Sequence, residues 1–321
     1  MSITTGTALT FREVDSHFGA HGDEVMRGLR RQPKLLPCKL FYDELGSKLF
    51  DEICKLDEYY PTRTELAIMR THAGRIAEQL GRRVMLIEYG SGSSTKTRIL
   101  LDHLCDPACY IPIDISREHL IRSATDLAEA YPNIEVSAVC ADYTQPFEVP
   151  HCDGASRRVV YFPGSTIGNF HQKRARVFLE RIAKVCGAEG GLLIGIDLKK
   201  DPLVLHRAYN DREGVTEAFN LNILVRINRE LDGDFDTDAF RHYAFYNVRR
   251  GRVEMHLVSR CDQTVRVRGA EIHFESGESV RTECSYKYTI DQFASLAVNF
   301  RIENVWTDAR RYFALLYLSV R

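Results

Sequence analysis

Short apolar runs alternate with stretches of helical period between residues 84 and 196, and this alternation constrains the fold more than any other feature of the chain. The apolar runs are residues 84–89, 110–113, 134–139, 158–162 and 191–196. The helical stretches between them are residues 96–103, 117–130 and 174–185. Strands that alternate with helices form a parallel sheet with helices on both faces. The sequence therefore predicts a doubly wound, Rossmann-like α/β domain.

A glycine turn joins the first predicted strand to the helix that follows it. Gly90 and Gly92 flank Ser91, and Lys96 lies in the first helical turn. Glycines let a ligand approach the backbone closely, and the N–H groups at a helix N-terminus face whatever lies above the turn. The turn predicts a ligand site, although a plain strand-to-helix connection can have the same local sequence.

Polar side chains also follow the second and third strands. Asp114 lies 24 residues after Gly90 (114 − 90), a spacing at which an acid accepts hydrogen bonds from ribose hydroxyls. Asp142 and Tyr143 follow the third strand, where a carboxylate can accept from an adenine amino group and a ring can stack on the base. The alternatives are helix capping for Asp142 and core packing for Tyr143. Taken together, these strand ends favour S-adenosylmethionine over a nicotinamide cofactor.

After Asp197 the strand–helix alternation ends. Residues 203–209 and 215–229 have helical period, and segments of alternating apolar and polar residues follow them. The alternating segments are residues 253–258, 264–267, 271–274 and 281–288. They predict antiparallel strands with one solvated face, and Glu283 and Ser285 point to the same side of the last one. The runs 301–305 and 312–320 predict a terminal hairpin. Such a hairpin completing a parallel sheet is typical of S-adenosylmethionine-dependent methyltransferases and unusual for dehydrogenases.

These patterns predict two domains. Residues 64–198 and 289–321 form the Rossmann-like domain, a class I methyltransferase sheet with a terminal antiparallel hairpin. Residues 1–63 and 199–288 form a second, α+β domain.

Charge, hydropathy and cysteine spacing exclude several classes of protein. The formal net charge is -1 at pH 7, so the chain lacks the basic character that nucleic-acid binding needs. No apolar run reaches the roughly 18 residues of a membrane span, and the first residues lack a signal-peptide pattern, so we expect a cytoplasmic protein. The nine cysteines are scattered without His or Cys partners at zinc spacing, so we expect free thiols and no metal.

Four motifs resemble those of a known family. They are EYYPTRTE at residues 58–65, GSGSSTK at 90–96, GSTIGN at 164–169 and ECSYK at 283–287. They are similar to segments of the L-histidine Nα-methyltransferases of ergothioneine biosynthesis, and the resemblance runs from about Phe41 to the C-terminus. It implies that the second domain, residues 1–63 and 199–288, is a substrate-binding domain. It also implies three methyl transfers from S-adenosylmethionine to the α-amino group of free L-histidine, which give hercynine (Nα,Nα,Nα-trimethylhistidine).

The resemblance also implies a role for each matching position. The residues implied for the cofactor are Gly90 and Lys96 at its methionine part, Asp114 at its ribose, Asp142 with Tyr143 at its adenine, and Ser91 and Gly92 of the same glycine turn. The residues implied for histidine are Tyr59, Asn169 and Tyr209 at its carboxylate and amine, Tyr42 near the amine, Glu283 and Ser285 at the imidazole, Met255 packed on the ring, and Gly164. Tyr42 and Asn169 are the implied catalytic residues. Tyr89, Pro163 and Tyr143 depart from the residues expected at their positions.

The chemistry of methyl transfer fits these residue types. The amine must be neutral and aimed at the sulfonium methyl group, and the reaction needs orientation rather than a metal. Neutral hydroxyls and an amide bind the substrate carboxylate without adding charge, whereas a carboxylate beside the amine would keep the amine protonated. Tyr42 is a candidate proton relay, with a purely positional role as the alternative. Glu283 can accept from one ring N–H while Ser285 bonds the other nitrogen, so analogues lacking these groups would be rejected.

Other functions stay open at this point. The nearest is an N-methyltransferase of the same family acting on another amino acid, such as tryptophan or a histidine derivative. A nicotinamide-dependent oxidoreductase is disfavoured by the terminal hairpin and by the absence of a third turn glycine. A regulatory protein with a degraded site is a third alternative. The small-molecule substrate is the only partner we expect, and the oligomeric state stays open, a monomer included.

Overall fold

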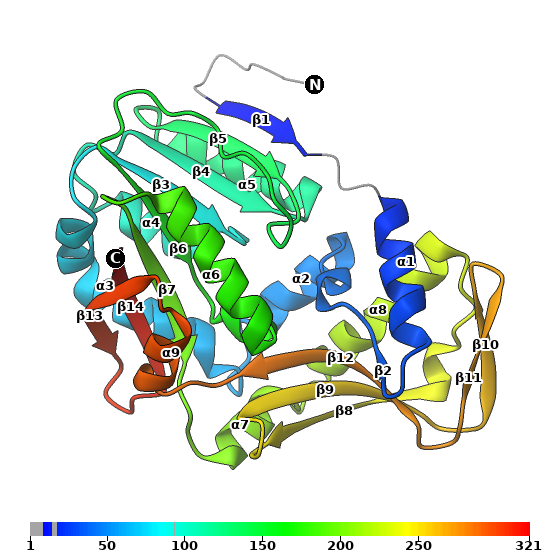
Figure 1. Ribbon diagram of the computed structural model, residues 1–321. Coiled ribbons are helices and arrows are strands. Elements are labelled where there is room, and N and C mark those ends of the chain that lie inside the picture. The colour runs from blue at the N-terminus through cyan, green and yellow to red at the C-terminus, as the bar shows by residue number, and fades with distance from the viewer. Residues whose placement is uncertain (1–8, 15–17, 93) are drawn as a thin grey trace. The chain divides into compact units, whose positions relative to one another are not determined.

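The computed structural model describes residues 9–14, 18–92 and 94–321, with the side chains of 18–21 excepted. Two compact units divide the chain (Figure 1). Unit 1 contains the described part of Met1–Asp15 together with Pro61–Lys199 and Lys287–Arg321. Unit 2 contains the described part of Ser16–Tyr60 together with Lys200–Tyr286.

Unit 1 is built on one eight-stranded sheet with the order β1-β5-β4-β3-β6-β7-β14-β13. The strands are β1 (Leu9–Glu13), β3 (Val84–Tyr89), β4 (Cys109–Asp114), β5 (Glu135–Cys140), β6 (Arg157–Phe162), β7 (Gly191–Asp197), β13 (Phe300–Thr307) and β14 (Phe313–Val320). The first six strands in this order are parallel, and β14 is antiparallel to both β7 and β13. The predicted parallel sheet with a terminal antiparallel hairpin is confirmed.

The helices of unit 1 follow its strands in sequence. They are α3 (Tyr60–Leu80), α4 (Thr95–Leu101), α5 (Arg117–Ala130), α6 (Gln172–Cys186) and α9 (Ile290–Leu296), with the 3₁₀ helix η2 (Thr166–Asn169). Every residue of β3 is buried, as expected for a parallel strand covered on both faces. Proline disfavours helical backbone at the residue before it, so the sequence predicts a helix over residues 65–79, after Pro61; helix α3 instead begins at Tyr60. Pro61 lies in its first turn, where proline's fixed φ favours helix and its missing N–H costs nothing.

Strand β1 differs from the predicted domain assignment, which placed all of residues 1–63 in the second domain. It pairs in parallel with β5, with Leu9 opposite Val136 and Glu13 opposite Cys140 (Figure 1). The strand is five residues long, lies at the sheet edge and is only partly buried. It therefore lacks the continuous apolar run that identified the central strands.

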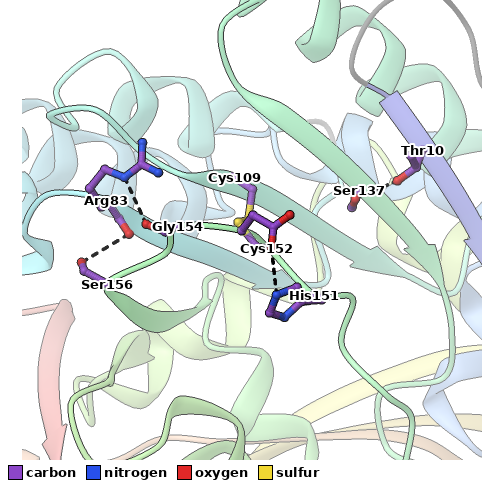
Figure 2. Close-up of a disulfide and its surroundings, with 9 residues drawn as sticks. Thr10, Arg83, Cys109, Ser137, His151, Cys152, Gly154 and Ser156 are labelled. Carbon is purple, nitrogen blue, oxygen red and sulfur yellow. Dashed lines mark hydrogen bonds and ion pairs between the residues drawn. A yellow bond between two sulfur atoms is a disulfide. The ribbon is translucent and has the colours of Figure 1, made fainter.

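A disulfide corrects the expectation that all nine cysteines are free thiols. Cys109, the first residue of β4, is bonded to Cys152 in the segment before β6, with the Cα atoms 6.4 Å apart (Figure 2). Ser156 Oγ in that segment also donates to the Arg83 carbonyl at 3.3 Å. The two cysteines are 43 residues apart and meet only because β4 and β6 both neighbour β3. Sequence spacing alone does not reveal this pairing.

Unit 2 is a mixed α+β unit. Its larger sheet has the order β2-β12-β9-β8, and β10 pairs with β11 in a separate hairpin. The strands are β2 (Lys34–Leu35), β8 (Phe240–Asn247), β9 (Arg252–Ser259), β10 (Gln263–Val267), β11 (Ala270–Phe274) and β12 (Ser279–Tyr286). The helices are α1 (Phe18–Leu29), α2 (Glu44–Ile53), α7 (Pro202–Ala208) and α8 (Val215–Leu231), with the 3₁₀ helices η1 (Cys38–Phe41) and η3 (Thr237–Ala239). Helix α8 packs on the larger sheet, where its Asn220 donates to the His256 carbonyl at 3.0 Å and accepts from Thr282 Oγ1 at 2.6 Å.

Across the described ranges, no helix has both the length and the apolar character needed to cross a membrane.

Candidate functional site

The glycine turn after β3 folds back over the end of β4. Gly90 N donates to the Ile113 carbonyl at 2.8 Å, and Gly92 N donates to Asp114 Oδ2 at 3.2 Å. Gly90 and Gly92 have φ values of 74° and 49°, in the left-handed region that favours glycine. The buried Ser91 hydroxyl has no hydrogen-bond partner among the described residues. Ser93 of the same motif lies outside the described ranges. The structure thus brings the turn and the Asp114 carboxylate together, as the ligand-site prediction requires.

Asp114 is held in place by backbone hydrogen bonds. Its Oδ1 accepts from Ser116 N at 2.9 Å while Oδ2 accepts from Gly92 N. Burial raises the pKa of this carboxyl above its ordinary value, although the two backbone N–H groups act in the opposite direction. The side chain is fixed at the carboxyl end of β4, where ligands of such sheets bind.

Asp142 and Tyr143 follow β5, as predicted, and have different surroundings. Asp142 Oδ1 accepts from Thr144 N at 2.9 Å and from Thr144 Oγ1 at 2.5 Å, so this carboxylate also shapes its own turn. The ring of Tyr143 stacks on that of Tyr89 with centroids 5.7 Å apart and an interplanar angle of 6°. A Cβ added at Gly90 would lie 3.9 Å from Tyr143 Cε1, so this ring is adjacent to the glycine turn. Tyr89 and Tyr143, two of the three residues that depart from the family pattern, therefore contact each other.

Lys96 is bound to a carboxylate that sequence reasoning did not single out. Its Nζ lies 2.5 Å from Glu65 Oε2 on α3, and Glu65 is fully buried. The same oxygen accepts from Gly164 N at 2.9 Å. Glu65 ends the EYYPTRTE motif, and this position was the only available signal of its role.

A second missed carboxylate lies below the glycine turn. Glu88, near the end of β3, accepts from Thr97 Oγ1 on α4 and from the Tyr110 hydroxyl on β4, both at 2.5 Å. Burial raises the pKa of Glu88 to about 7. Glu88 on β3 therefore bonds to α4 and to β4, the two elements beside the glycine turn.

The loop after β6 carries Gly164 and Asn169. Gly164 and Ser165 have positive φ values, of 74° and 58°, and Asn169 ends η2. Ser165 Oγ accepts from Asp197 N at 2.8 Å, and Asp197 forms a buried ion pair with Lys287 Nζ at 2.8 Å. The Ser165–Asp197 hydrogen bond joins the loop to the end of β7, and the ion pair joins the end of β7 to Lys287.

In unit 2, the predicted tyrosines gather around a small aromatic cluster. Tyr59 lies edge-on to Tyr209, with centroids 6.3 Å apart, and Tyr42 lies edge-on to Phe50 at 5.8 Å. Phe50 also contacts Tyr59 at 6.2 Å. Burial raises the pKa of Tyr59 well above its ordinary value, and repulsion from neighbouring groups, Tyr209 and Glu283 among them, adds to this effect. Tyr59 is therefore a neutral hydroxyl at physiological pH.

Glu283, Ser285 and Met255 lie on adjacent strands of the unit 2 sheet. Glu283 is directly opposite Met255, and Ser285 is opposite Val253, in the antiparallel β12–β9 pair. A register shift occurs between Arg281 and Glu283. Ser285 and Met255 are buried and Glu283 is half-buried. The two polar side chains and the methionine thus share one face of the sheet.

The predicted residues therefore form two sets. Unit 1 holds the residues predicted for the cofactor together with Gly164 and Asn169, and unit 2 holds the other residues predicted for histidine. Within the parts of the chain that the structure describes, no three His, Cys, Asp or Glu side chains come together as metal ligands.

Comparison with known proteins identifies the family. A family model described as "Histidine-specific methyltransferase, SAM-dependent" matches residues 21–320. The chain belongs to this family. It is 43% identical over 315 residues to the histidine N-alpha-methyltransferase of Mycolicibacterium smegmatis, covering 96% of this chain and 97% of that protein. Identity to the histidine N-alpha-methyltransferase of Mycobacterium tuberculosis is 40% over 300 residues, covering 91% and 92%.

A fungal relative is longer. The chain is 30% identical over 302 residues to Ergothioneine biosynthesis protein 1 of Neurospora crassa, covering 87% of this chain and 32% of that protein. The family resemblance inferred from the four motifs is confirmed, and the protein is a member of a methyltransferase family that uses S-adenosylmethionine.

Proposed function

We propose that this protein transfers methyl groups from S-adenosylmethionine to the α-amino group of free L-histidine, three times in succession, to give hercynine in ergothioneine biosynthesis. The match to the histidine-specific family over residues 21–320 carries the proposal, because that span includes every predicted site residue. The protein is proposed to act in the cytoplasm on small molecules, without nucleic acid, membrane or metal.

The cofactor is proposed to bind above the glycine turn of unit 1. The Ser91 hydroxyl, which has no hydrogen-bond partner among the described residues, and the Lys96 ammonium suit the methionine carboxylate, and the Asp114 carboxylate suits the ribose hydroxyls. The ring of Tyr143 offers a face for the adenine, and Asp142 an acceptor for its amino group. The backbone bonds that fix Asp114 and the stack that supports Tyr143 favour these roles, since both side chains are positioned before a ligand arrives.

Each methyl transfer is an in-line displacement at the sulfonium. The neutral amine attacks the methyl carbon, the C–N bond forms as the C–S bond breaks, and S-adenosylhomocysteine leaves. After the first and second transfers, the new ammonium must lose a proton before it can react again. The raised pKa of Tyr59 supports a role as a neutral hydrogen-bond donor, and Tyr42 or a water is proposed to take the proton. Asn169 and Tyr209 are proposed to orient the carboxylate and amine.

Specificity for histidine is proposed to arise in the unit 2 sheet. Glu283 accepts from one imidazole N–H, Ser285 bonds the second ring nitrogen, and Met255 packs on the ring. The register that puts Met255 opposite Glu283 supports this arrangement, because cross-strand neighbours reach the same bound group. An indole offers only one ring nitrogen, so a tryptophan substrate would leave a buried polar group without a partner.

A panel experiment tests the proposal. The purified protein is incubated with S-adenosylmethionine and each of the twenty standard amino acids in turn, and products are identified by mass spectrometry. We expect mono-, di- and trimethylated histidine and no methylation of tryptophan. Methylation of another amino acid with histidine untouched would overturn the substrate assignment, and methylation of none would overturn the activity.

A further inference from the structure

Glu65 is a fully buried carboxylate that joins three separate segments of unit 1. It projects from α3, and its Oε2 bonds both Lys96 Nζ, at 2.5 Å, and Gly164 N, at 2.9 Å. Lys96 is the second residue of α4, after the glycine turn, and Gly164 is the second residue of the loop that leads from β6 to Asn169. One oxygen atom therefore links the loop after β3 to the loop after β6.

The opposite oxygen of Glu65 lies against the middle of β7. A Cβ added at Gly195 would come within 2.3 Å of Glu65 Oε1, so glycine at this position leaves room for the carboxylate. Oε1 is buried and has no hydrogen-bond partner in the described part of the chain. A buried acceptor without a partner reduces stability. Folding alone would be served as well by apolar residues in place of the Glu65–Lys96 pair.

We propose that Glu65 is a positioning residue that fixes the Lys96 ammonium and the Gly164 turn relative to each other. The proposal rests on the proposed function, in which Lys96 binds the cofactor and the Gly164–Asn169 loop binds histidine. A lysine side chain is long and flexible, and its ammonium has three donors. Glu65 takes one donor, which orients the other two, and it supplies the counter-charge that keeps the ammonium in place beside Gly164, where a Cβ would lie 3.7 Å from Lys96 Nζ.

The geometry also predicts that Glu65 couples the two ligands. Its bond to Gly164 N fixes the start of the loop that carries Asn169, while its bond to Lys96 fixes the methionine end of the cofactor site. Loss of the Glu65 carboxylate should therefore weaken the binding of both ligands. Loss of Lys96 alone should mainly weaken the binding of the cofactor.

A double-mutant cycle on the full-length protein tests this role. S-adenosylhomocysteine is the probe, and its affinity is measured by calorimetry for wild type, E65Q, K96M and the E65Q/K96M double variant. We expect E65Q to weaken binding about tenfold and the double variant to bind no more weakly than K96M, because Glu65 acts on this ligand through Lys96. The KM for histidine should rise in E65Q and change less than threefold in K96M.

Two further variants separate positioning from folding. E278Q breaks the Lys34–Glu278 pair of unit 2, a matched lysine–glutamate contact, and should leave the affinity for S-adenosylhomocysteine within twofold of wild type. E65M/K96M replaces both charges by apolar side chains, and its melting temperature should be close to that of wild type. Its affinity for S-adenosylhomocysteine should fall as much as that of K96M.

Several outcomes would overturn the proposal. One is wild-type affinity for S-adenosylhomocysteine in E65Q while K96M binds it more weakly. Others are additive losses of affinity in the cycle and wild-type affinity in E65M/K96M. The last is failure of both E65Q and E65M/K96M to fold, which would mean that the pair serves folding. The cycle does not depend on turnover. A protein that binds S-adenosylhomocysteine with the expected coupling but does not methylate histidine would refute the proposed function and leave the positioning of Lys96 standing.

Discussion

At the scale of single residues, the carboxylates of unit 1 are the side chains that organise the proposed cofactor site. Asp114 is held by two backbone N–H groups, Glu65 by Lys96 and the Gly164 N–H, and Glu88 by two hydroxyls. Each lies at or below the carboxyl ends of the parallel strands. Glu283 belongs to unit 2 and is proposed to bind the imidazole of the substrate.

Glu88 makes the stability of the protein depend on pH. Its pKa is about 7 in the fold, against about 4.5 for an ordinary glutamate, so the folded state holds a proton that the unfolded state loses between these values. This contribution is fully present below about pH 4.5 and is lost as the pH rises through 7, on the order of 3 kcal/mol in total. Urea unfolding from pH 5 to 8 should show the decline in wild type and a flatter profile in E88Q. Identical slopes for the two proteins would contradict this prediction.

Glu283 is predicted to act on substrate affinity and ring selectivity. Replacement by alanine leaves an imidazole N–H without its acceptor, so the KM for histidine should rise by roughly 10- to 100-fold while analogues with other rings lose less. Steady-state kinetics with histidine and ring analogues measure this effect. Affinity for S-adenosylhomocysteine, which should be unchanged, is the control. Unaltered histidine affinity and selectivity would exclude the imidazole role.

At the scale of elements, buried parallel strands could be predicted because they are continuous apolar runs, as in β3, where all six residues are buried. The edge strand β1 could not, since a short, partly exposed strand is held mainly by backbone bonds to distant β5. The start of α3 differs from the prediction because proline disfavours helix at the preceding residue but is also common in the first turn of a helix, and Pro61 takes the second position. In β12 the alternation of Glu283 and Ser285 was visible, but the register shift beside Glu283 was not, since it depends on pairing with β9.

Replacement of Asp114 should weaken ligand binding at the turn between β3 and α4. Its carboxylate fixes the turn through Gly92 N and is proposed to bind the ribose, so D114A should weaken S-adenosylhomocysteine binding by roughly tenfold or more, as for a lost hydrogen bond to a charged group. Calorimetry measures the affinity, and circular dichroism checks that the variant is folded. A folded D114A with wild-type affinity would refute the ribose role.

The Cys109–Cys152 disulfide should stabilise unit 1 without influencing the proposed cofactor site. It closes a loop of 43 residues and joins the amino end of β4 to the segment before β6. A loop of this length corresponds to about 4 kcal/mol in the chain-entropy model. Dithiothreitol should therefore lower the urea midpoint of wild type and leave that of C109S/C152S unchanged, with similar S-adenosylhomocysteine affinity in all samples. An equal effect of reductant on both proteins would contradict the prediction.

At the scale of the whole molecule, the chain combines a methyltransferase sheet with a second α+β unit. The end of the strand–helix alternation near residue 198 and the alternating apolar and polar segments from residue 253 made a second domain predictable, because each pattern belongs to a different kind of sheet. The boundaries between the two compact units fall after residues 15, 60, 199 and 286. That unit 1 binds the cofactor and unit 2 most of the substrate stays a prediction. The pairing of Glu65 with Lys96 and Gly164 could not be predicted, since these residues are 31 and 99 positions apart and meet only in the folded unit.

The most direct test of the central claim is the site and number of methyl groups that the protein adds to histidine. Free L-histidine is incubated with excess S-adenosylmethionine, samples are taken over time, and tandem mass spectrometry locates each methyl group. We expect mono- and dimethylated intermediates followed by a single end product with all three methyl groups on the α-amino nitrogen. Methyl groups on an imidazole nitrogen, or a reaction that stops after one transfer, would contradict the account.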